Sequence, residues 1–547
     1  MAYEDGLREA RDRLTAEWGI HARRVRALAR GLAGQDWQSV RDLVEAHGVS
    51  RREAQNALRR LEPWLERDGE RVRLADPAGA AKVFGCDAPA PPPDPYETLA
   101  AEHPDVVAFM AEALDGLAPP VQRLDHVSVT PATAVKRALL LTTGYDLAGA
   151  SVLCLGDHDL TSLALLRLRP DLDVTVVDVD EDVLAQVGRV ARARGWTVRT
   201  VFADLRVELP TSLTGRFDLV FTDQPYTPEG TRLFLARGLA SLRQADTSRI
   251  LCCYGFGERH PALGLKIQDE LTRLRLVAEA ILPGFNRYHG AEAIGSRSAL
   301  YVCRPTSGSW AAAERAAAIT GPRIYTHGPE SVEARPQQLP DGLARDVRKD
   351  LGEAVTIVGE GWPATVHALP LSAYLRDRKT RRGKPPFTRG PHEETVAVSL
   401  LPSYGGYLAR ILLLAGAARL VLVTAAKDDQ LTRLADLLDS VCEVTVRNRD
   451  GLAIVTATRA LPPAEPVSAT LRDVIDHPHA TLGSAWREAL IRTASVHDRN
   501  LTKNEARSLI AATDIGRSHA ASHLAELPLD ALSGLAAAVR STVSAAT

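Results

Sequence analysis

Residues 152–160 read VLCLGDHDL, and this stretch decides the fold. The apolar run at 152–155 is typical of a short buried strand, and Gly156 stands at the turn that follows it. A glycine between a strand and a helix lets a nucleoside approach the backbone, because no Cβ is in the way. The stretch therefore predicts the first strand and the first turn of a nucleotide-binding α/β sheet.

Strand-like and helical runs alternate around this stretch up to about residue 303. Strands that are separated by helices are typical of a doubly wound, mostly parallel sheet, so we predict an α/β, Rossmann-like fold. The expected strands are residues 152–155, 174–178, 197–202, 217–222, 249–254, 276–282 and 300–303.

Acidic residues stand at the ends of the second and third expected strands. Asp178 and Asp180 come about twenty residues after the first turn, where a carboxylate can accept hydrogen bonds from both ribose hydroxyls of a cofactor. Asp204 follows the third strand, where S-adenosylmethionine enzymes place an acid near the adenine amine. The alternative is that these acids only cap helices. The candidate nucleoside-binding residues are Gly156, Asp157, Asp178, Asp180 and Asp204.

The first turn lacks the second glycine of the GxGxxG dinucleotide pattern, and Asp157, His158 and Asp159 stand there instead. Carboxylates at this place would repel a pyrophosphate or the carboxylate of S-adenosylmethionine. They suit an aminopropyl cation and a polyamine. The turn therefore favours decarboxylated S-adenosylmethionine as the co-substrate, with S-adenosylmethionine as the alternative.

The fourth expected strand ends in Asp223, Gln224, Pro225 and Tyr226. An Asp-x-Pro-Tyr sequence at this strand end also occurs in enzymes that alkylate amino groups, where the carboxylate and a backbone carbonyl hold the amine and the ring covers it. The alternative is a strand exit made by the proline, with a packed tyrosine. We predict that these four residues bind the acceptor.

Five segments together resemble the branched-chain polyamine synthases, the bis(aminopropyl)spermidine synthase family, over residues 1 to about 305. In this family a winged-helix N-terminal domain precedes a Rossmann-like catalytic domain. The segments are VTPATAV at 129–135, GDHDLTS at 156–162, TDQP at 222–225, FLARGL at 234–239 and GAEAIGSRS at 290–298.

The resemblance implies transfer of an aminopropyl group from decarboxylated S-adenosylmethionine to an amine, such as spermidine or a related amine, with release of methylthioadenosine. The family's first turn reads Gly-Asp-Asp-Asp, and its last aspartate is thought to take the proton of the amine; that position is Asp159 here. This chain differs from the family by His158 in the turn and by Gln224, where Asp-Pro-Pro is usual.

The reaction itself needs a proton acceptor, because an aliphatic amine with a pKa of about 10 is almost wholly charged near neutral pH. A carboxylate must hold the cation and accept its proton as the nitrogen attacks the carbon beside the sulfonium. We predict Asp159 as the base, with His158 as the alternative. Asp223 and Glu292 would hold the amine, and Tyr226 would stack over the reacting centre.

The pattern along the chain predicts five regions. Residues 1–80 form a winged-helix-like domain whose nearly equal numbers of basic and acidic residues disfavour DNA binding. The others are a proline-rich linker and connecting helix at 81–125, the Rossmann-like catalytic domain at 126–305, a second, smaller α/β domain at 320–460 and a helical C-terminal region at 468–547.

The composition limits the remaining possibilities. The 547 residues include 66 Lys and Arg against 68 Asp and Glu, which disfavours a nucleic-acid partner. Six cysteines without a CxxC spacing predict neither disulfides nor a metal site. We expect no membrane association, a cytoplasmic location, a homodimer and a small-molecule amine substrate. Two alternatives stay open: an S-adenosylmethionine-dependent N-methyltransferase of natural-product biosynthesis, and a winged-helix DNA-binding regulator that senses a nucleoside or polyamine.

Overall fold

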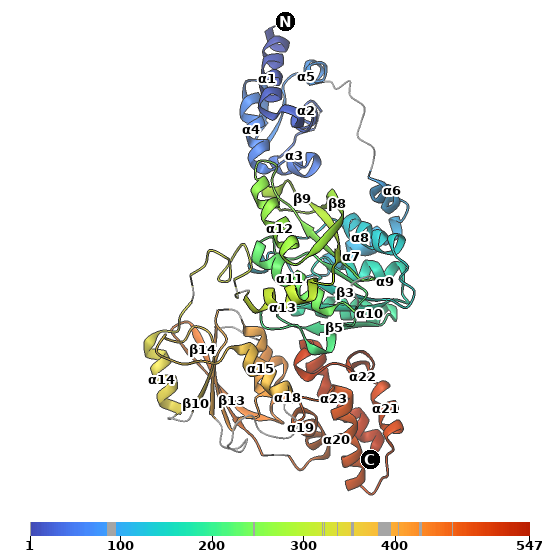
Figure 1. Cartoon of the computed structure of the whole chain (residues 1–547), viewed down its shortest axis with the longest axis vertical. Coiled ribbons are helices and arrows are strands. Elements are labelled where there is room, and N and C mark those ends of the chain that lie inside the picture. The colour runs from blue at the N-terminus through green and yellow to red at the C-terminus, as the bar shows by residue number, and fades with distance from the viewer. Residues whose placement is uncertain are drawn as a thin grey trace. The chain divides into compact units, whose positions relative to one another are not determined.

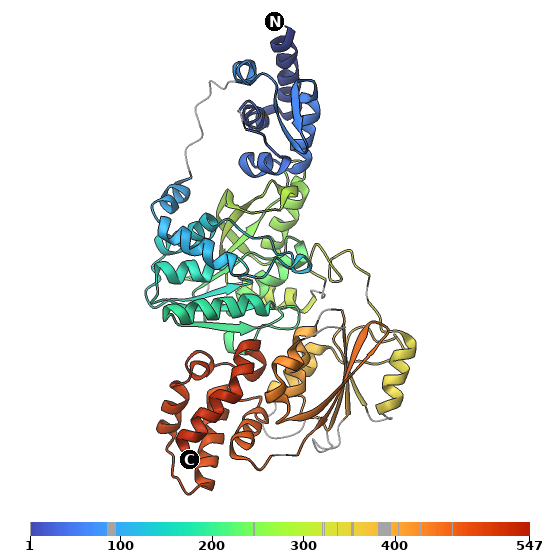
Figure 2. The same ribbon diagram turned by 180° about the vertical axis from the view of Figure 1, so that it is seen from behind.

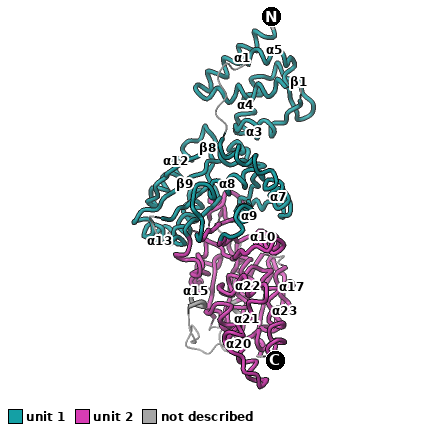
Figure 3. The backbone as a smooth tube through the Cα atoms, turned by 90° about the vertical axis from the view of Figure 1, so that its right-hand side faces the viewer, with its two compact units in different colours: residues 1–150, 158–172, 218–318 teal, residues 151–157, 173–217, 319–547 magenta. Residues whose placement is uncertain are grey.

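The computed structural model describes most of the chain, and contacts divide it into two units (Figure 3). Unit 1 comprises residues 1–150, 158–172 and 218–318, and unit 2 comprises residues 151–157, 173–217 and 319–547. The described residues are 2–34, 36–84, 94–243, 247–319, 321, 323–335, 337–351, 355–380, 395–402, 404–425, 429–461 and 463–547. Most of the expected proline-rich linker lies outside them, in residues 85–93.

Unit 1 begins with a helical region that has its own hydrophobic core. Capping boxes at Ser39 and Ser50 start two of its helices, since each serine accepts the N–H of the residue three positions on. A hairpin follows, with Gly69 in the left-handed conformation at its turn. The elements are α1 (Ala2–Trp18), α2 (Ala22–Gly31), α3 (Val40–His47), α4 (Arg51–Leu61), β1 (Leu65–Asp68), β2 (Arg71–Leu74) and α5 (Pro77–Phe84).

The central sheet has seven strands in the order β5-β4-β3-β6-β7-β9-β8, which confirms the predicted α/β, Rossmann-like fold (Figure 1). In unit 2, β4 is paired in parallel with both β3 and β5. In unit 1, β6 and β7 are parallel, whereas β9 is antiparallel to both β7 and β8. The strands are β3 (Ser151–Leu155), β4 (Asp173–Asp178), β5 (Val198–Phe202), β6 (Leu219–Thr222), β7 (Arg249–Tyr254), β8 (Leu276–Arg287) and β9 (Arg297–Pro305).

The last two strands are longer than the sequence predicts. Much of β8 is exposed or half-buried, and Pro283 and Gly284 interrupt the apolar run by which a strand is recognised. Every residue of β3, by contrast, is buried. The helices of this region are α6 (Pro95–Ala101), α7 (Pro104–Asp115), α8 (Pro131–Gly144), α9 (Thr161–Leu168), α10 (Glu181–Arg194), α11 (Pro228–Ser241), α12 (Pro261–Arg273) and α13 (Ser309–Ile319).

The C-terminal part of unit 2 contains the expected second, smaller α/β fold. Its five strands have the order β10-β11-β12-β14-β13, of which β10, β11 and β12 are parallel. Helix α14 packs on one face of this sheet (Figure 2). Its residues Leu343 and Val347 belong to the same hydrophobic cluster as Val421 and Ile454 of the sheet. The elements are α14 (Asp341–Leu351), β10 (Val355–Gly359), α15 (Leu371–Thr380), β11 (Thr395–Ser399), α16 (Leu408–Leu414), β12 (Arg419–Ala425), α17 (Gln430–Arg433), α18 (Ala435–Leu438), β13 (Cys442–Arg449) and β14 (Leu452–Arg459).

The predicted helical C-terminal region is also present. Trp486 is fully buried in its core, and the indole N–H donates to the hydroxyl of Thr542 at 3.0 Å. Among the helices that the structure describes, none is long and apolar enough to cross a membrane. The helices are α19 (Pro466–Ile475), α20 (Leu482–Val496), α21 (Lys503–Ala511), α22 (Asp514–His519) and α23 (Leu529–Ala546).

Candidate functional site

Two of the predicted acidic residues meet at a buried arginine in unit 1. Arg137 of α8 is fully buried, and its Nη1 lies 2.8 Å from Oδ2 of Asp159. Its Nη2 lies 2.5 Å from Oδ2 of Asp223, in the turn after β6. The remaining nitrogen of the guanidinium, Nε, donates to Oδ1 of Asn286 at 2.8 Å. The structure therefore joins Asp159 and Asp223 through one cation.

The sequence analysis missed Arg137, although a signal for it was present. Lys136 and Arg137 interrupt the apolar run of a helix that begins at Pro131, and both are buried. A charge on the buried face of a helix must find an opposite charge, because desolvating it alone is very costly. Such a pair of charges inside an apolar helix could have indicated a buried acidic partner.

Two tyrosine hydroxyls complete the surroundings of Asp223. Tyr226 donates to Oδ1 at 3.0 Å, and Tyr288 donates to Oδ2 at 2.9 Å. The Tyr288 hydroxyl also lies 2.8 Å from that of Ser298. Burial and the neighbouring charge of Asp159 raise the pKa of Asp223, and Arg137 opposes this shift. Neither Tyr288 nor Ser298 belonged to the predicted site.

Gln224 points away from this group of charges. Its side chain is 2% exposed, and its amide donates to the carbonyl of Cys253 at 2.8 Å, which ties the turn after β6 to β7. Within the described part of the chain, Gln224 Oε1 has no hydrogen-bond partner. Pro225 is buried beside it.

His158 stacks on another histidine. The ring of His158 lies 4.1 Å from that of His126, and the two planes are inclined by 19°. Burial, together with the charges of His158 and Arg123, lowers the pKa of His126 to about 3, so His126 is neutral at pH 7. The neighbouring Asp159 is bound on its other oxygen by the backbone N–H of Val129, at 3.2 Å.

Glu292 is paired with a residue of the N-terminal region. Its carboxylate forms an ion pair with Arg51 at the start of α4, and Glu53 of the same helix lies 3.5 Å from Arg259. The structure therefore places Glu292 against α4, and its predicted contact with the amine stays a prediction. These two ion pairs lie at the N-terminal end of α4, and one of them occupies Arg51, a basic residue of this helix.

The other predicted acidic residues lie in unit 2, at the ends of β3 and β4. Gly156 has a φ of +70°, in the left-handed region that favours glycine, and its N–H donates to the carbonyl of Val177 at 2.8 Å. Asp178 accepts the N–H groups of Asp157 at 2.9 Å and of Asp180 at 2.8 Å. Burial and the charge of Asp180 raise the pKa of Asp178 to about 7.

Asp180 and Asp204 have further roles that the sequence did not separate. Asp180 caps α10, since its Oδ1 accepts the N–H of Asp182 at 2.9 Å. Asp204 is 2% exposed, and Arg206 binds both of its oxygens: Nε lies 2.9 Å from Oδ1, and Nη2 lies 2.5 Å from Oδ2. Asp180 therefore caps a helix and Asp204 is one half of a buried ion pair, while their contacts with a nucleoside stay predictions.

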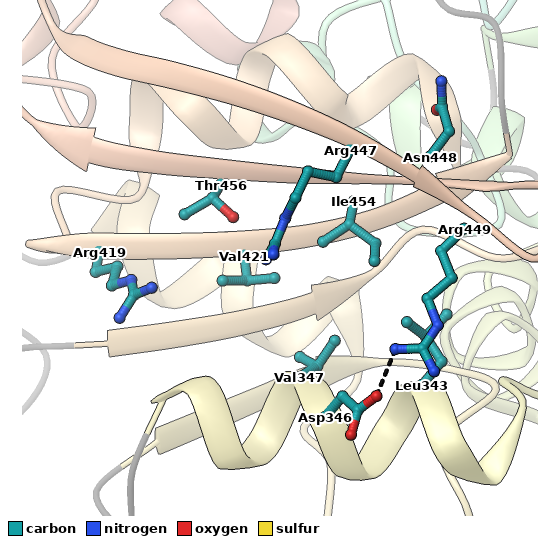
Figure 4. A pocket seen from close by; sticks show the side chains of 10 residues that line it. All are labelled: Leu343, Asp346, Val347, Arg419, Val421, Arg447, Asn448, Arg449, Ile454 and Thr456. Carbon is teal, nitrogen blue, oxygen red and sulfur yellow. Dashed lines mark hydrogen bonds and ion pairs between the residues drawn. The ribbon is translucent and has the colours of Figure 1, made fainter.

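A separate cavity of about 200 Å³ lies on the second sheet, beside α14 (Figure 4). Apolar side chains line it together with Arg419, Arg447 and Arg449, and Arg449 is paired with Asp346. None of the predicted site residues lines this cavity. In the described residues, no group of three or more His, Cys, Asp and Glu side chains is arranged to hold a metal ion.

The mostly parallel sheet and the glycine turn after β3 define a Rossmann-like α/β fold. Residues 113–315 match the family model of the branched-chain polyamine synthase A C-terminal domain. The resemblance inferred from the sequence is therefore confirmed for this part of the chain.

Curated relatives match about a third of the chain. An uncharacterized protein of Methanocaldococcus jannaschii is 34% identical over 173 residues, which are 32% of this chain and 43% of that protein. The N(4)-bis(aminopropyl)spermidine synthase of Thermococcus kodakarensis is 33% identical over 175 residues, 31% of this chain and 48% of that enzyme. This chain thus spans about half the length of these relatives.

A solved structure gives a similar comparison. The branched-chain polyamine synthase from Thermus thermophilus, in complex with N4-aminopropylspermidine and 5'-methylthioadenosine, aligns with a TM-score of 0.39 and 22% identity. The alignment covers 55% of this chain and 93% of that one.

Proposed function

We propose that the protein is an aminopropyltransferase, which moves an aminopropyl group from decarboxylated S-adenosylmethionine to an amine and releases methylthioadenosine. The observation that carries the proposal is the buried charge of the group around Arg137. Two carboxylates, Asp159 and Asp223, share one guanidinium, so the ionised group lacks one positive charge. An ammonium group of an acceptor such as spermidine would supply that charge.

The donor would bind at the turns after β3, β4 and β5. Gly156 leaves room for the nucleoside, and the ribose hydroxyls would donate to Asp178 or Asp180. Asp204 would face the adenine amine, held in place by Arg206. Asp157 would favour a donor without a carboxylate, because it places a negative charge in the first turn.

The acceptor would lie against Asp159 and Asp223. Asp159 remains our proposed base, in line with the family resemblance. The raised pKa of Asp223 supports a share in the proton transfer, since a carboxylate with a raised pKa takes a proton more readily. The hydroxyls of Tyr226 and Tyr288 would keep Asp223 oriented while the amine attacks the carbon next to sulfur.

The donor experiment tests this function directly. The purified protein is incubated with spermidine and either decarboxylated S-adenosylmethionine or S-adenosylmethionine, and the nucleoside product is identified by mass. We expect methylthioadenosine from the decarboxylated donor. Formation of S-adenosylhomocysteine alone would contradict the proposal and favour an N-methyltransferase. A salt-sensitive gel shift on DNA without turnover would favour the regulator instead.

The raised pKa of Asp178 predicts how donor binding depends on pH. A ribose hydroxyl donates better to an ionised carboxylate than to a protonated one. The affinity for methylthioadenosine is therefore expected to increase between about pH 6 and pH 8, through the pKa of about 7. Isothermal titration calorimetry measures it. Asp178→Asn should bind more weakly and show no such increase; an unchanged pH profile in this variant would contradict the assignment.

Stability should change with pH in the opposite direction. The folded-state pKa of Asp178 lies above its ordinary value, so its contribution is present below that ordinary value and is lost as the pH rises through about 7. Melting temperatures of the wild type and Asp178→Asn, measured between about pH 4 and pH 7, would show this. The melting temperature of the wild type should fall more steeply with rising pH than that of the variant.

The N-terminal region is proposed to be a winged helix with a structural role, because Arg51 and Glu53 of α4 contact Glu292 and Arg259. The homodimer and the cytoplasmic location stay predictions.

A further inference from the structure

Two turns of the proposed donor site are held by residues that lie far along the chain, after residue 319. These turns follow β4 and β5, and they carry Asp178, Asp180 and Asp204. All the contacts described below lie within unit 2.

Arg206 is the centre of the first group of contacts. Its side chain is 2% exposed, and it binds Asp204 with Nε and Nη2. Its remaining Nη1 lies 2.7 Å from Oε1 of Glu330, a residue that is itself 1% exposed. The rings of Tyr325 and Tyr404 lie 5.6 and 4.9 Å from the guanidinium. A buried arginine between two carboxylates is fixed firmly, because moving it would leave charges unpaired.

Tyr407 reaches the same turn by another route. Its hydroxyl accepts the backbone N–H of Asp204 at 3.4 Å. Its ring packs edge-on against Phe202, the last residue of β5, with 5.3 Å between the ring centroids. The start of the turn is therefore held through its backbone as well as through Arg206.

Arg410 of α16 is the centre of the second group. It is 1% exposed, and its guanidinium lies 3.5 Å above the ring of Phe202. Its Nη2 lies 2.5 Å from Oε1 of Glu181, the first residue of α10. The other oxygen of Glu181 accepts the N–H of Leu529 at 2.8 Å. The start of α10, immediately after Asp180, is thus bound by α16 and by the start of α23.

We propose that the part of the chain after residue 319 completes the donor site, with Glu330, Tyr407 and Arg410 as positioning residues. They hold the turns after β4 and β5 in the shape that binds the nucleoside of the donor. This inference rests on the proposed function and deepens it, because it assigns the C-terminal part to the donor and not to the acceptor.

The test uses two mild variants of the full chain. Glu330→Gln removes the charge beside Arg206 and keeps the size of the side chain. Tyr407→Phe removes only the hydroxyl that accepts the N–H of Asp204. We expect Glu330→Gln to raise the KM for the donor and the Kd for methylthioadenosine about tenfold, because a misplaced turn loses contacts with the nucleoside. Tyr407→Phe should show a smaller increase in both. The KM for the acceptor and kcat should stay within about twofold.

A matched control separates positioning from general loss of stability. Asp476→Asn breaks an ion pair with Arg459 and Arg472, in the same C-terminal part but outside both groups of contacts. We expect it to lower the melting temperature and to leave methylthioadenosine binding unchanged. Equal loss of binding in the control and in Glu330→Gln would overturn the inference, as would wild-type affinity in both Glu330→Gln and Tyr407→Phe.

Failure of the proposed function has a different outcome. A wild-type protein that binds neither methylthioadenosine nor S-adenosylhomocysteine would overturn the donor site as a whole, and this inference with it. If the wild type binds the nucleoside and turns over, and Glu330→Gln and Tyr407→Phe do so equally well, only this inference is overturned.

Discussion

Replacing Arg137 by alanine is expected to lower the free energy of unfolding by about 3–5 kcal/mol at pH 7, the usual cost of breaking a buried ion pair. The variant would leave Asp159 and Asp223 close together in a buried place with no cation between them. Urea denaturation, followed by far-UV circular dichroism, would measure the loss.

The loss should depend on pH in a defined direction. Burial and the neighbouring charge of Asp159 raise the pKa of Asp223, and removing Arg137 removes the cation that opposes this shift. The variant is therefore least affected in acid, where Asp223 binds a proton, and loses stability as the pH rises. A deficit that grows toward low pH would contradict this interpretation.

Two further variants serve as controls for Arg137. Arg137→Lys keeps the charge, but a single ammonium cannot replace a guanidinium that contacts Asp159, Asp223 and Asn286 at once. It should be intermediate in stability. Arg167→Ala removes a surface pair with Asp105, which typically changes stability by less than about 1 kcal/mol. Equal stability of the wild type and Arg137→Ala would show that the buried charges do not stabilise the fold.

The second large effect is expected on catalysis. Asp159→Asn and Asp223→Asn should each lower kcat by about 10²–10⁴, the usual contribution of a positioned acid or base. Binding of methylthioadenosine should persist, because these two residues are proposed to face the acceptor. Steady-state kinetics with decarboxylated S-adenosylmethionine and spermidine, together with calorimetry, would measure both quantities.

The pH profile distinguishes the two aspartates. If Asp223 takes the proton, the wild-type rate falls as the pH drops through its raised pKa, and Asp223→Asn lacks this dependence. Retained turnover in Asp159→Asn would move the role of base away from Asp159, to Asp223 or to His158. Asp105→Asn is the matched control, since it removes an equal charge from a surface pair with Arg167. An equal fall in kcat there would show that loss of any carboxylate, and not of these two, lowers the rate.

Much of the fold could be predicted because its signals are local. The apolar runs at 152–155 and 174–178 correspond to β3 and β4, and Gly156 adopts the left-handed conformation that the turn requires. The family resemblance also depended on short segments, and residues 113–315 bear it out. The long strand β8 was predicted too short, because Pro283 and Gly284, which rarely continue a strand, follow its apolar part.

The candidate site was predicted only in part. Sequence placed Asp159 and Asp223 at two strand ends, where parallel strands bring their carboxyl ends to one edge. The sequence indicated no partner for either carboxylate, because Arg137 lies 22 residues from Asp159 and 86 residues from Asp223 along the chain. Glu292 was assigned to the amine from its family segment alone, whereas its ion pair with Arg51 joins residues 241 apart.

Local sequence signals, such as those of residues 152–160, and tertiary packing determined different features of this protein. By itself, the sequence determined a strand, a glycine turn and a row of acidic residues, because backbone preference and apolar periodicity act over a few residues. Only the tertiary structure decided which cations neutralise those acids: Arg137 for Asp159 and Asp223, and Arg206 for Asp204. The physical reason is that a buried charge is balanced by whatever group the packing brings within about 3 Å, and sequence distance sets no limit on that choice.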